Sequence, residues 1–399
     1  MRKKASPANS FPAKNAVFYA CAALISVILI AFLLQMLHKT LAPANKDFTT
    51  YLYAATDLLA GINPYARATN FPYVYPMFFA VLMIPLTFLP LWLSAVIWFL
   101  VLVSSLYLLI KLFVNLLPKG MGGKWGRQLI LPVFLTLLLF TNPLQGNFLW
   151  LQVNILVLFF CVLFLHFYTA KKPFIASLVL AVAVSIKIVP AIFLLFLAFR
   201  REFKLIALCL LFTAVFCIGL PYLFLGEGVF PAYRSYTDNF ILRAPDLAFA
   251  SREHAFFSLN GFMYYIFPSF STLPFVKYLT LFFIAAPLAL IDALNYRKAW
   301  AFPVIFSLYL TAVPLIVTDS QVPHLILILP AVLLIVLRLF FIKGWRTGVN
   351  VAVSTCIVLC FILARIFGYS PFWFISLVLI SFLLVRMLSS SPKIPSRRS

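Results

Sequence analysis

Runs of apolar residues alternate with short polar or basic breaks along almost the whole chain. A helix that crosses a bilayer needs about 20 predominantly apolar residues, and most of these runs reach that length. The pattern therefore predicts an all-α protein that crosses a membrane many times. The expected spans are 16–37, 73–90, 92–117, 128–142, 148–169, 174–199, 203–225, 274–293, 299–318, 322–342, 348–366 and 371–388.

The positions of Lys and Arg predict the orientation of these spans, because basic residues concentrate on the cytoplasmic side of a membrane protein. With the basic clusters inside, both termini are cytoplasmic, and the two longest polar segments, 38–72 and 226–273, are extracytoplasmic loops. We expect one domain over 16–388 with about 11–13 transmembrane helices. The basic clusters occupy the N-terminal segment 1–15, the breaks at 171–172, 200–204, 297–298 and 343–346, and the tail 389–399.

The composition agrees with a membrane location. Hydrophobic residues make up 64% of the 399 residues and charged residues only 10%, with a mean hydropathy of +1.08. The net charge of +22 would suggest a nucleic-acid partner for a soluble protein. Here it reflects orientation, so membrane lipids are expected as partners and nucleic acid is not. Most of the nine acids fall in the predicted outer segments, namely Asp47, Asp57, Glu227, Asp238, Asp246, Glu253 and Asp319.

Two features do not fit a simple series of crossings. If 73–90 and 92–117 both span the membrane, Lys119, Lys124 and Arg127 fall outside, against the charge rule. We therefore expect one early segment to be short, re-entrant or interfacial. Lys187 interrupts the run 174–199, with Pro190 three residues later, so a tight two-helix hairpin is an alternative there. An ionisable residue inside a membrane segment is a functional candidate by default.

The first outer segment contains a short amphipathic helix with an acidic residue at its start. Apolar residues at Phe48, Tyr51, Leu52, Ala55 and Leu59 recur at helical spacing, and Gly61 ends the helix. The carboxylate that precedes them, Asp47, has two compatible interpretations. It caps the free N–H groups of the helix, or it acts as a general base at the water–membrane boundary. Asp57 lies ten residues further along the same helix, about 80° off the line of Asp47, and is expected to be solvated.

Several kinds of chemistry have no support in the sequence. There is no D-x-D pair to bind a metal with a nucleotide sugar, no G-x-x-x-x-G-K-[ST] loop for ATP and no H-E-x-x-H zinc pattern. The six cysteines lie in apolar stretches without C-x-x-C spacing. We expect neither a metal nor a cofactor.

A set of short motifs, in order along the chain, resembles glycosyltransferase family 87. The set begins with Asp47, Tyr51, Gly61 and Pro64-Tyr65, and continues with "FPYVYPMFFAVLMIPLTFLP", "LQGNFLWLQVN", "IKIVP", "FSLNGFMYYIF" and "HLILILP". The chain departs from the family pattern at Tyr75-Pro76-Met77, where adjacent prolines are usual. It also lacks the glycine that normally precedes Gln152. These departures leave the sugar and the acceptor open.

The resemblance implies a GT-C type helical bundle that transfers mannose from a polyprenyl-phosphate-linked donor to a lipid or cell-envelope glycan. In this family the first outer loop supplies the catalytic Asp, which Asp47 matches. The expected location is the plasma membrane, with the active site facing the cell exterior or periplasm. A polytopic secondary transporter or lipid flippase is the main alternative, and a polymerase of the O-antigen type is another.

The leaving phosphate of such a donor requires positive charge, and five residues on or near the outer face are candidates. Alternatively, the two loop arginines pair with neighbouring acids, and the two histidines serve in packing. Other polar side chains are candidates for sugar or acceptor binding, although those near helix ends also suit capping. The phosphate candidates are Lys187, Arg252, Arg243, His254 and His324. The sugar and acceptor candidates are Tyr51, Gln145, Gln152, Asn154 and Asn260.

Overall fold

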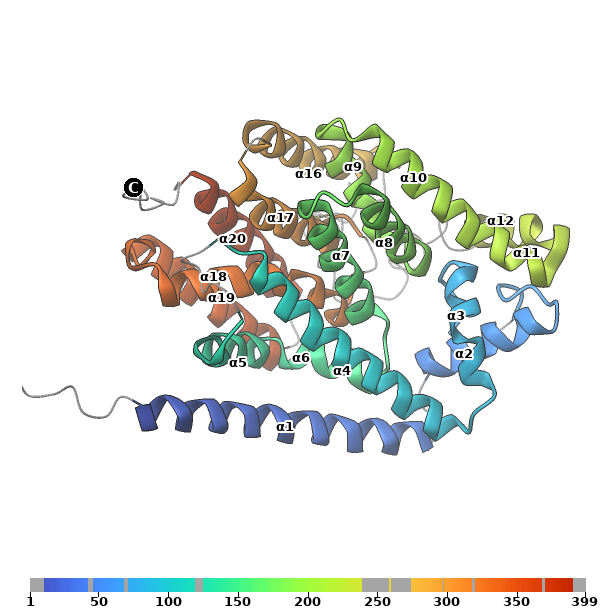
Figure 1. Ribbon diagram of the computed structural model, residues 1–399, viewed down its shortest axis with the longest axis horizontal. Helices are drawn as coiled ribbons and strands as arrows, with labels where there is room; N and C mark the ends of the chain where they lie inside the picture. Colours follow the sequence, from blue (N-terminus) through green and yellow to red (C-terminus); the bar gives the residue numbers. More distant parts are fainter. Residues whose placement is uncertain are drawn as a thin grey trace, which may run out of the picture.

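The computed structural model describes residues 11–41, 46–67, 71–118, 125–238, 258–259, 274–296, 298–317, 320–367 and 370–389 (Figure 1). Within these ranges the chain is helical and contains no strand, which confirms the all-α class. The helices are α1 (Phe11–Leu41), α2 (Lys46–Leu59), α3 (Met77–Thr87), α4 (Leu91–Asn115), α5 (Ile130–Leu139), α6 (Thr141–Leu149), α7 (Asn154–Thr169), α8 (Pro173–Ile186), α9 (Ile192–Phe199), α10 (Phe203–Ala214), α11 (Leu220–Leu225), α12 (Val229–Tyr236), α16 (Pro274–Asn295), α17 (Phe302–Ile316), α18 (Leu329–Phe341), α19 (Gly348–Phe367) and α20 (Ser370–Ser389).

The described helices confirm a protein that crosses a membrane several times. Six of them are long and apolar enough to span a bilayer, and a seventh span results if α5 and α6, bent by 71°, cross together. Six shorter apolar helices of 10–17 residues accompany them. Fewer helices therefore span a membrane by length alone than the 11–13 expected, because several predicted spans are broken or short.

Helix α3 is a short early segment of the kind that the conflict with the charge rule predicts. Its 11 residues extend about 16 Å, roughly half of a 30 Å hydrocarbon core. If α3 does not cross, α4 returns antiparallel to α1 and finishes at the same end of the molecule as the start of α1 (Figure 1). Arg127 Nη1 donates a hydrogen bond of 3.2 Å to Asn15 Oδ1, which ties the two ends together.

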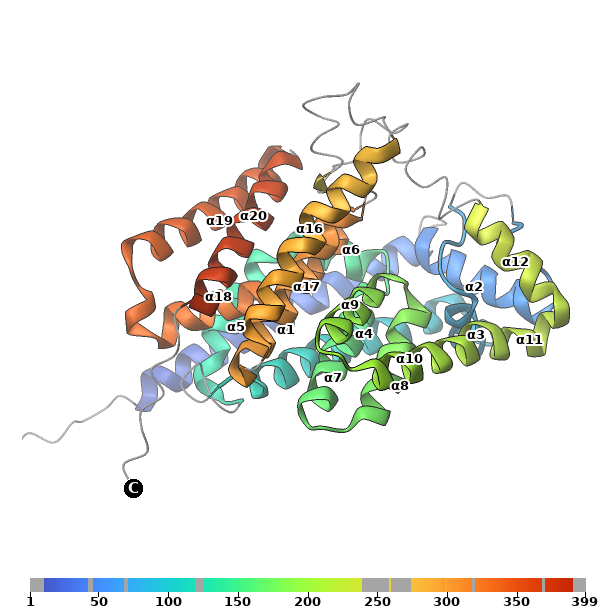
Figure 2. The same ribbon diagram turned by 90° about the horizontal axis from the view of Figure 1, so that it is seen from above.

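At the other end of α1, helices α2 and α3 lie beside α11 and α12 in both views (Figures 1 and 2). Aromatic side chains join them: the rings of Tyr65 and Tyr236 are 4.9 Å apart, and Tyr236 Oη donates to the Val74 carbonyl at 3.3 Å. Parts of the two long polar segments predicted from the sequence thus meet at one end of the molecule.

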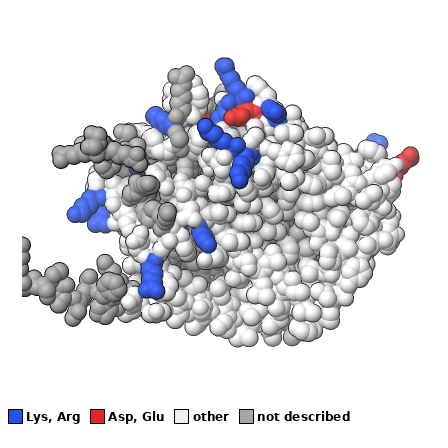
Figure 3. All heavy atoms as spheres, in the orientation of Figure 1, with Lys and Arg blue, Asp and Glu red and all other residues white. Residues whose placement is uncertain are grey.

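Charged side chains occupy a small part of the surface. The face in Figure 3 is mostly uncharged, and Lys and Arg gather at one end and along the edge where α9, α10 and α16 lie. One acid at that edge is buried: Asp292, at 0% exposed, pairs with Arg200 and accepts a 3.3 Å hydrogen bond from Tyr309. The Arg200 guanidinium lies 4.3 Å and 4.4 Å from the ring centres of Phe196 and Phe302. This buried pair holds α9 against α16.

Four predicted spans are broken or irregular, and these irregularities bring polar groups inside the bundle. The run 174–199 is divided into α8 and α9 at Lys187, whose backbone is extended. The runs 128–142 and 148–169 are reorganised into α5, the bent α6 and α7. The run 322–342 begins as a 3-10 helix, Val322–Ile328, before α18. A continuous helix would direct some of the polar side chains in these runs towards lipid. Where the helix is interrupted, these side chains point into the bundle instead.

Candidate active site

Helix α2 places Asp47 in its first turn, where the helix dipole favours a negative charge. Phe48, Tyr51, Ala55 and Leu58 form the buried side of this helix, each at 1% exposed or less. Leu59, the last residue of the predicted apolar face, is 41% exposed, and its neighbour Leu58 is fully buried. Gly61 has a φ of +69°, a left-handed conformation that suits glycine, and the helix ends just before it, as predicted.

The Asp47 side chain accepts a hydrogen bond from an amide across the bundle. Gln152 Nε2 donates to Asp47 Oδ2 at 2.9 Å. Gln152 Oε1 in turn accepts from Asn154 Nδ2 at 2.9 Å. Asn154 is the first residue of α7 and is 2% exposed. The two amides therefore link the start of α2 to the start of α7.

The same hydrogen-bonded series continues to two basic side chains. Lys187 Nζ donates to Asn154 Oδ1 at 2.7 Å and lies 3.1 Å from His324 Nε2. The backbone N–H of Gln321 donates to His324 Nδ1 at 3.1 Å. Because Nδ1 accepts in that bond, Nε2 carries the proton when the imidazole is neutral, so the Lys187 ammonium and His324 Nε2–H are two neighbouring donors. This arrangement orients the ring towards Lys187.

We call the connected side chains of Asp47, Gln152, Asn154, Lys187 and His324 the polar chain. They come from the start of α2, the α6–α7 connection, the start of α7, the break between α8 and α9, and the 3-10 helix before α18. A carboxylate stands at one end of the chain and a lysine and a histidine at the other, with two neutral amides between them. Five of the residues expected from sequence to share a site are thus within hydrogen-bonding contact.

The Gln152 end of the polar chain is held by an unusual turn. Leu151 has a φ of +53° and is fully buried, a conformation that costs a non-glycine residue roughly 1–2 kcal/mol. Trp98 Nε1 donates to the Leu151 carbonyl at 2.9 Å, and the Gln152 N–H donates to the Asn147 carbonyl at 2.9 Å. The turn ends α6 and directs Gln152 towards Asp47. Nothing in the sequence pattern indicated the part played by Trp98.

The His324 end is held by close packing against α6. Asn147 Nδ2 donates to the Pro323 carbonyl at 2.8 Å. A Cβ built on Gly146 would lie 2.7 Å from Pro323 Cγ, closer than real side chains approach. Gly146 and Asn147 therefore allow the segment that carries His324 to rest directly on α6. Both residues lie in the "LQGNFLWLQVN" motif, which is the signal that marks them.

Tyr51 reaches the polar chain through a second tyrosine. Its hydroxyl lies 3.2 Å from that of Tyr75, and Lys187 Nζ lies 5.7 Å from the centre of the Tyr75 ring. Tyr51 is 1% exposed, so it packs and positions Tyr75 instead of offering an open face to a ligand. Of the two tyrosines, Tyr75 is the one beside the lysine.

The electrostatics of the site favour a proton acceptor at Asp47. Burial raises the pKa of the Asp47 carboxyl, while the hydrogen bond from Gln152 and the charge of Lys187 both act to lower it. The net effect is a pKa above its ordinary value. A carboxylate with a raised pKa is a stronger base than an exposed one.

The other candidate residues lie elsewhere. Gln145 Nε2 is 3.4 Å from Gln35 Oε1, on the side of α6 that faces α1, away from the polar chain. Asp57 was expected to be solvated, but it is 5% exposed and forms an ion pair with Arg67. Among the described residues, no group of three or more His, Cys, Asp and Glu side chains is placed to hold a metal ion. Arg243, Arg252, His254 and Asn260 lie outside the described residues.

Comparison with known protein families gives one match. The sequence model of glycosyltransferase family 87 matches residues 73–364, which include four members of the polar chain, Gln152, Asn154, Lys187 and His324. The match begins after α2, so Asp47 precedes it. No curated protein and no solved structure matches the chain.

Proposed function

Because the chain belongs to glycosyltransferase family 87, we propose that it transfers a hexose, specifically mannose, from a polyprenyl-phosphate-linked donor to a hydroxyl of a lipid or cell-envelope glycan. The reaction takes place at the extracytoplasmic face of the plasma membrane, and both termini are cytoplasmic. Family membership makes the chain a transferase and leaves the transporter and flippase alternatives without separate support.

The polar chain is the observation that carries this proposal. Glycosyl transfer with inversion needs a base for the acceptor hydroxyl and a positive charge for the leaving phosphate. Asp47 accepts the proton as the acceptor oxygen forms a bond to the anomeric carbon. The bond between that carbon and the phosphate oxygen breaks, and the electron pair leaves with the polyprenyl phosphate. Lys187 and His324 then stabilise the developing negative charge.

The two amides of the polar chain keep the base and the cation in fixed relation. Gln152 and Asn154 each donate towards the carboxylate end and accept from the lysine end. Their hydrogen bonds hold the Asp47 and Lys187 side chains in position, and the amides themselves carry no charge. A donor that lies along the polar chain therefore meets a base at one end and a positive charge at the other, as an in-line displacement requires.

The orientation of the helices supports an extracytoplasmic site. When α1 crosses from the basic N-terminal segment, α2 and Asp47 lie at the opposite end. With α3 too short to cross, α4 returns to the basic end, where Arg127 contacts Asn15 near the start of α1. The exception to the charge rule then disappears.

The proposal is tested by transfer from defined donors. Purified protein in lipid nanodiscs is supplied with an octyl mannoside acceptor and either radiolabelled polyprenyl-phosphate-mannose, polyprenyl-phosphate-glucose or GDP-mannose. We expect label in the acceptor from the lipid-linked mannose alone. Transfer from GDP-mannose would overturn the lipid-phosphate donor, and transfer from the glucose donor would overturn the choice of mannose.

The pH dependence of transfer should report the environment of Asp47. The carboxylate must be deprotonated to act as a base, and burial raises its pKa. Transfer should therefore decline, as the pH falls, at a higher pH than the ordinary carboxyl pKa of about 4 would give. Gln152→Leu removes a hydrogen bond that lowers this pKa, so the acid limb of the kcat/KM profile should move to higher pH.

The matched control for Gln152→Leu is Gln145→Leu in the same motif. Gln145 contacts Gln35 and not Asp47, so its removal should leave the acid limb where it is. An acid limb that does not move in the Gln152 variant, or that moves equally in both variants, would contradict the assignment of this limb to Asp47.

A further inference from the structure

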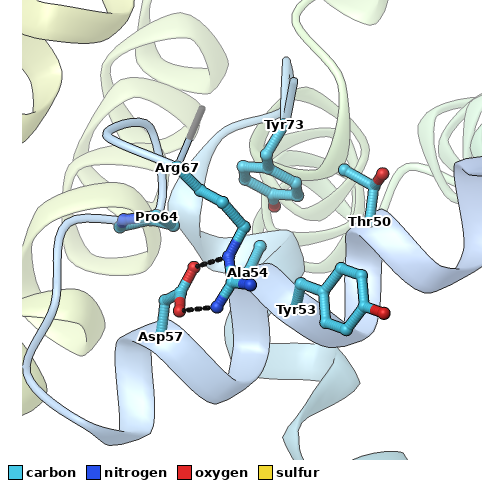
Figure 4. A pocket seen from close by; sticks show the side chains of 7 residues that line it. All are labelled: Thr50, Tyr53, Ala54, Asp57, Pro64, Arg67 and Tyr73. Atoms are coloured by element: carbon cyan, nitrogen blue, oxygen red, sulfur yellow. Dashed lines mark hydrogen bonds and ion pairs between the residues drawn. The ribbon is translucent and has the colours of Figure 1, made fainter. Parts of the chain in front are cut away.

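A second polar site lies further along α2, about two turns beyond the polar chain. It is a shallow depression open at the surface, with a cavity volume of only about 10 Å³. Figure 4 shows its lining side chains, which come from α2, from the connection that follows it and from the segment before α3. They are Thr50, Tyr53, Ala54, Asp57, Pro64, Arg67 and Tyr73.

An ion pair forms one wall of this pocket. Arg67 Nε donates to Asp57 Oδ2 at 2.8 Å, and Arg67 Nη2 donates to the other carboxylate oxygen (Figure 4). The Asp57 side chain is 7% exposed, whereas that of Arg67 is 43% exposed. The pair engages two of the five N–H donors of the guanidinium. The outer edge of Arg67 therefore faces solvent, while the buried carboxylate balances its charge.

An aromatic ring lies beside the guanidinium. The guanidinium carbon of Arg67 is 4.9 Å from the centre of the Tyr53 ring, and Tyr53 is 49% exposed. Exposed tyrosine offers a flat apolar face together with a polar edge. Sugar rings present C–H groups on their faces and hydroxyls around their edges, so an aromatic face next to an N–H fork matches a neutral sugar. An anion gains less here, because Asp57 already balances Arg67.

The position of the pocket relative to Asp47 follows from helix geometry. Ala54 is seven residues after Asp47, about 20° short of two full turns, and about 10 Å along the helix axis. Asp57 lies about 15 Å along the axis and about 80° short of three turns. The pocket therefore opens on the side of α2 next to the one that carries Asp47. A molecule with its reacting hydroxyl at Asp47 reaches the pocket only if it extends beyond one sugar residue.

We propose that Asp57, Arg67 and Tyr53 form an acceptor subsite that binds a sugar residue distal to the reacting hydroxyl of a neutral oligosaccharide. This inference rests on the proposed function and adds the class of acceptor: an extended glycan, not a single sugar or an unglycosylated lipid. The ion pair between Asp57 and Arg67 holds the connection after α2 and leaves guanidinium N–H groups to donate to sugar hydroxyls. The Tyr53 ring packs against the face of the sugar.

The test compares a short and a long acceptor in wild type and in Tyr53→Ala. With polyprenyl-phosphate-mannose as donor, the acceptors are octyl mannoside and octyl mannotetraoside. Loss of an aromatic contact should raise KM for the tetraoside about 3-fold to 10-fold, with kcat unchanged. KM for the monosaccharide acceptor should stay the same. The control is Tyr107→Ala. Tyr107 lies in α4, is 50% exposed like Tyr53, and its ring contacts Trp125 and not the pocket.

A donor-free titration separates this inference from the proposed function. Isothermal calorimetry of octyl mannotetraoside should show weaker binding to Tyr53→Ala than to wild type or Tyr107→Ala, whether or not transfer occurs. Equal binding to all three proteins, or an equal rise in KM for both acceptors, would overturn the subsite. Absence of transfer by wild type together with the expected binding differences would overturn the proposed donor and leave the subsite standing.

Discussion

Replacing Asp47 with asparagine should reduce sugar transfer by about 10²-fold to 10⁴-fold, the usual contribution of a general base. Asparagine has nearly the same shape and keeps an oxygen that accepts from Gln152, so the polar chain remains connected. It is too weak a base to take the hydroxyl proton. The loss should therefore appear in kcat, while KM for the lipid-linked donor changes little.

The control for Asp47→Asn is Asp238→Asn. The Asp238 side chain is 55% exposed, and its Oδ2 lies 3.9 Å from Nε of Arg234, four residues earlier. An exposed ion pair of this kind contributes little to stability. This variant should transfer sugar at the wild-type rate. Single-turnover rates of the three proteins in the same nanodiscs provide the measurement. An Asp47 variant that keeps a substantial part of the wild-type rate would show that the base lies elsewhere.

Replacing Lys187 with methionine should reduce transfer by about 10²-fold to 10³-fold, the effect of removing one preorganised donor to a developing negative charge. Methionine retains most of the length of the side chain but neither its charge nor its hydrogen bond to Asn154. Lys187 also lowers the pKa of Asp47. Its loss should therefore move the acid limb of the pH profile upwards as well.

The two effects of Lys187 distinguish a role in catalysis from a role in folding. A thermal unfolding curve in the same nanodiscs shows whether the variant is folded. Lys171→Met removes an exposed lysine at the basic end of the molecule and should change neither rate nor pH profile. A folded Lys187 variant with a wild-type rate would remove the lysine from the mechanism and leave His324 Nε2–H as the donor to the leaving phosphate.

Much of the candidate site could be predicted from the sequence because its members lie in short motifs between long apolar runs. Lys187 is an ionisable residue in a segment where charge is costly, Asp47 begins an amphipathic helix in a predicted outer segment, and His324 is a basic residue near the predicted outer face. The structure brings these three together through Gln152 and Asn154. The contacts between them join residues up to 137 positions apart, and no periodicity carries that information.

Other residues show where the sequence was misleading. Gln145 and Gln152 lie in the same motif, yet only Gln152 contacts Asp47, because the left-handed turn at Leu151 reverses the chain between them. Asp57 was expected to be solvated, but Arg67 neutralises it in a buried position. In both cases the outcome depends on one tertiary contact or one backbone angle that the pattern of residue types does not encode.

The sequence by itself determined the class of the protein and the order of its elements. Long apolar runs require helices in a membrane, because every backbone N–H and C=O must be bonded within the segment, and the basic residues predict which ends lie together. Only the tertiary structure decided which helices are short or broken. That depends on side-chain packing, as at Pro323 on Gly146, and on unwinding at Lys187, where an inward hydrogen bond replaces helical continuity. These breaks bring the carboxylate of α2 and the lysine and histidine of the later segments into one polar chain.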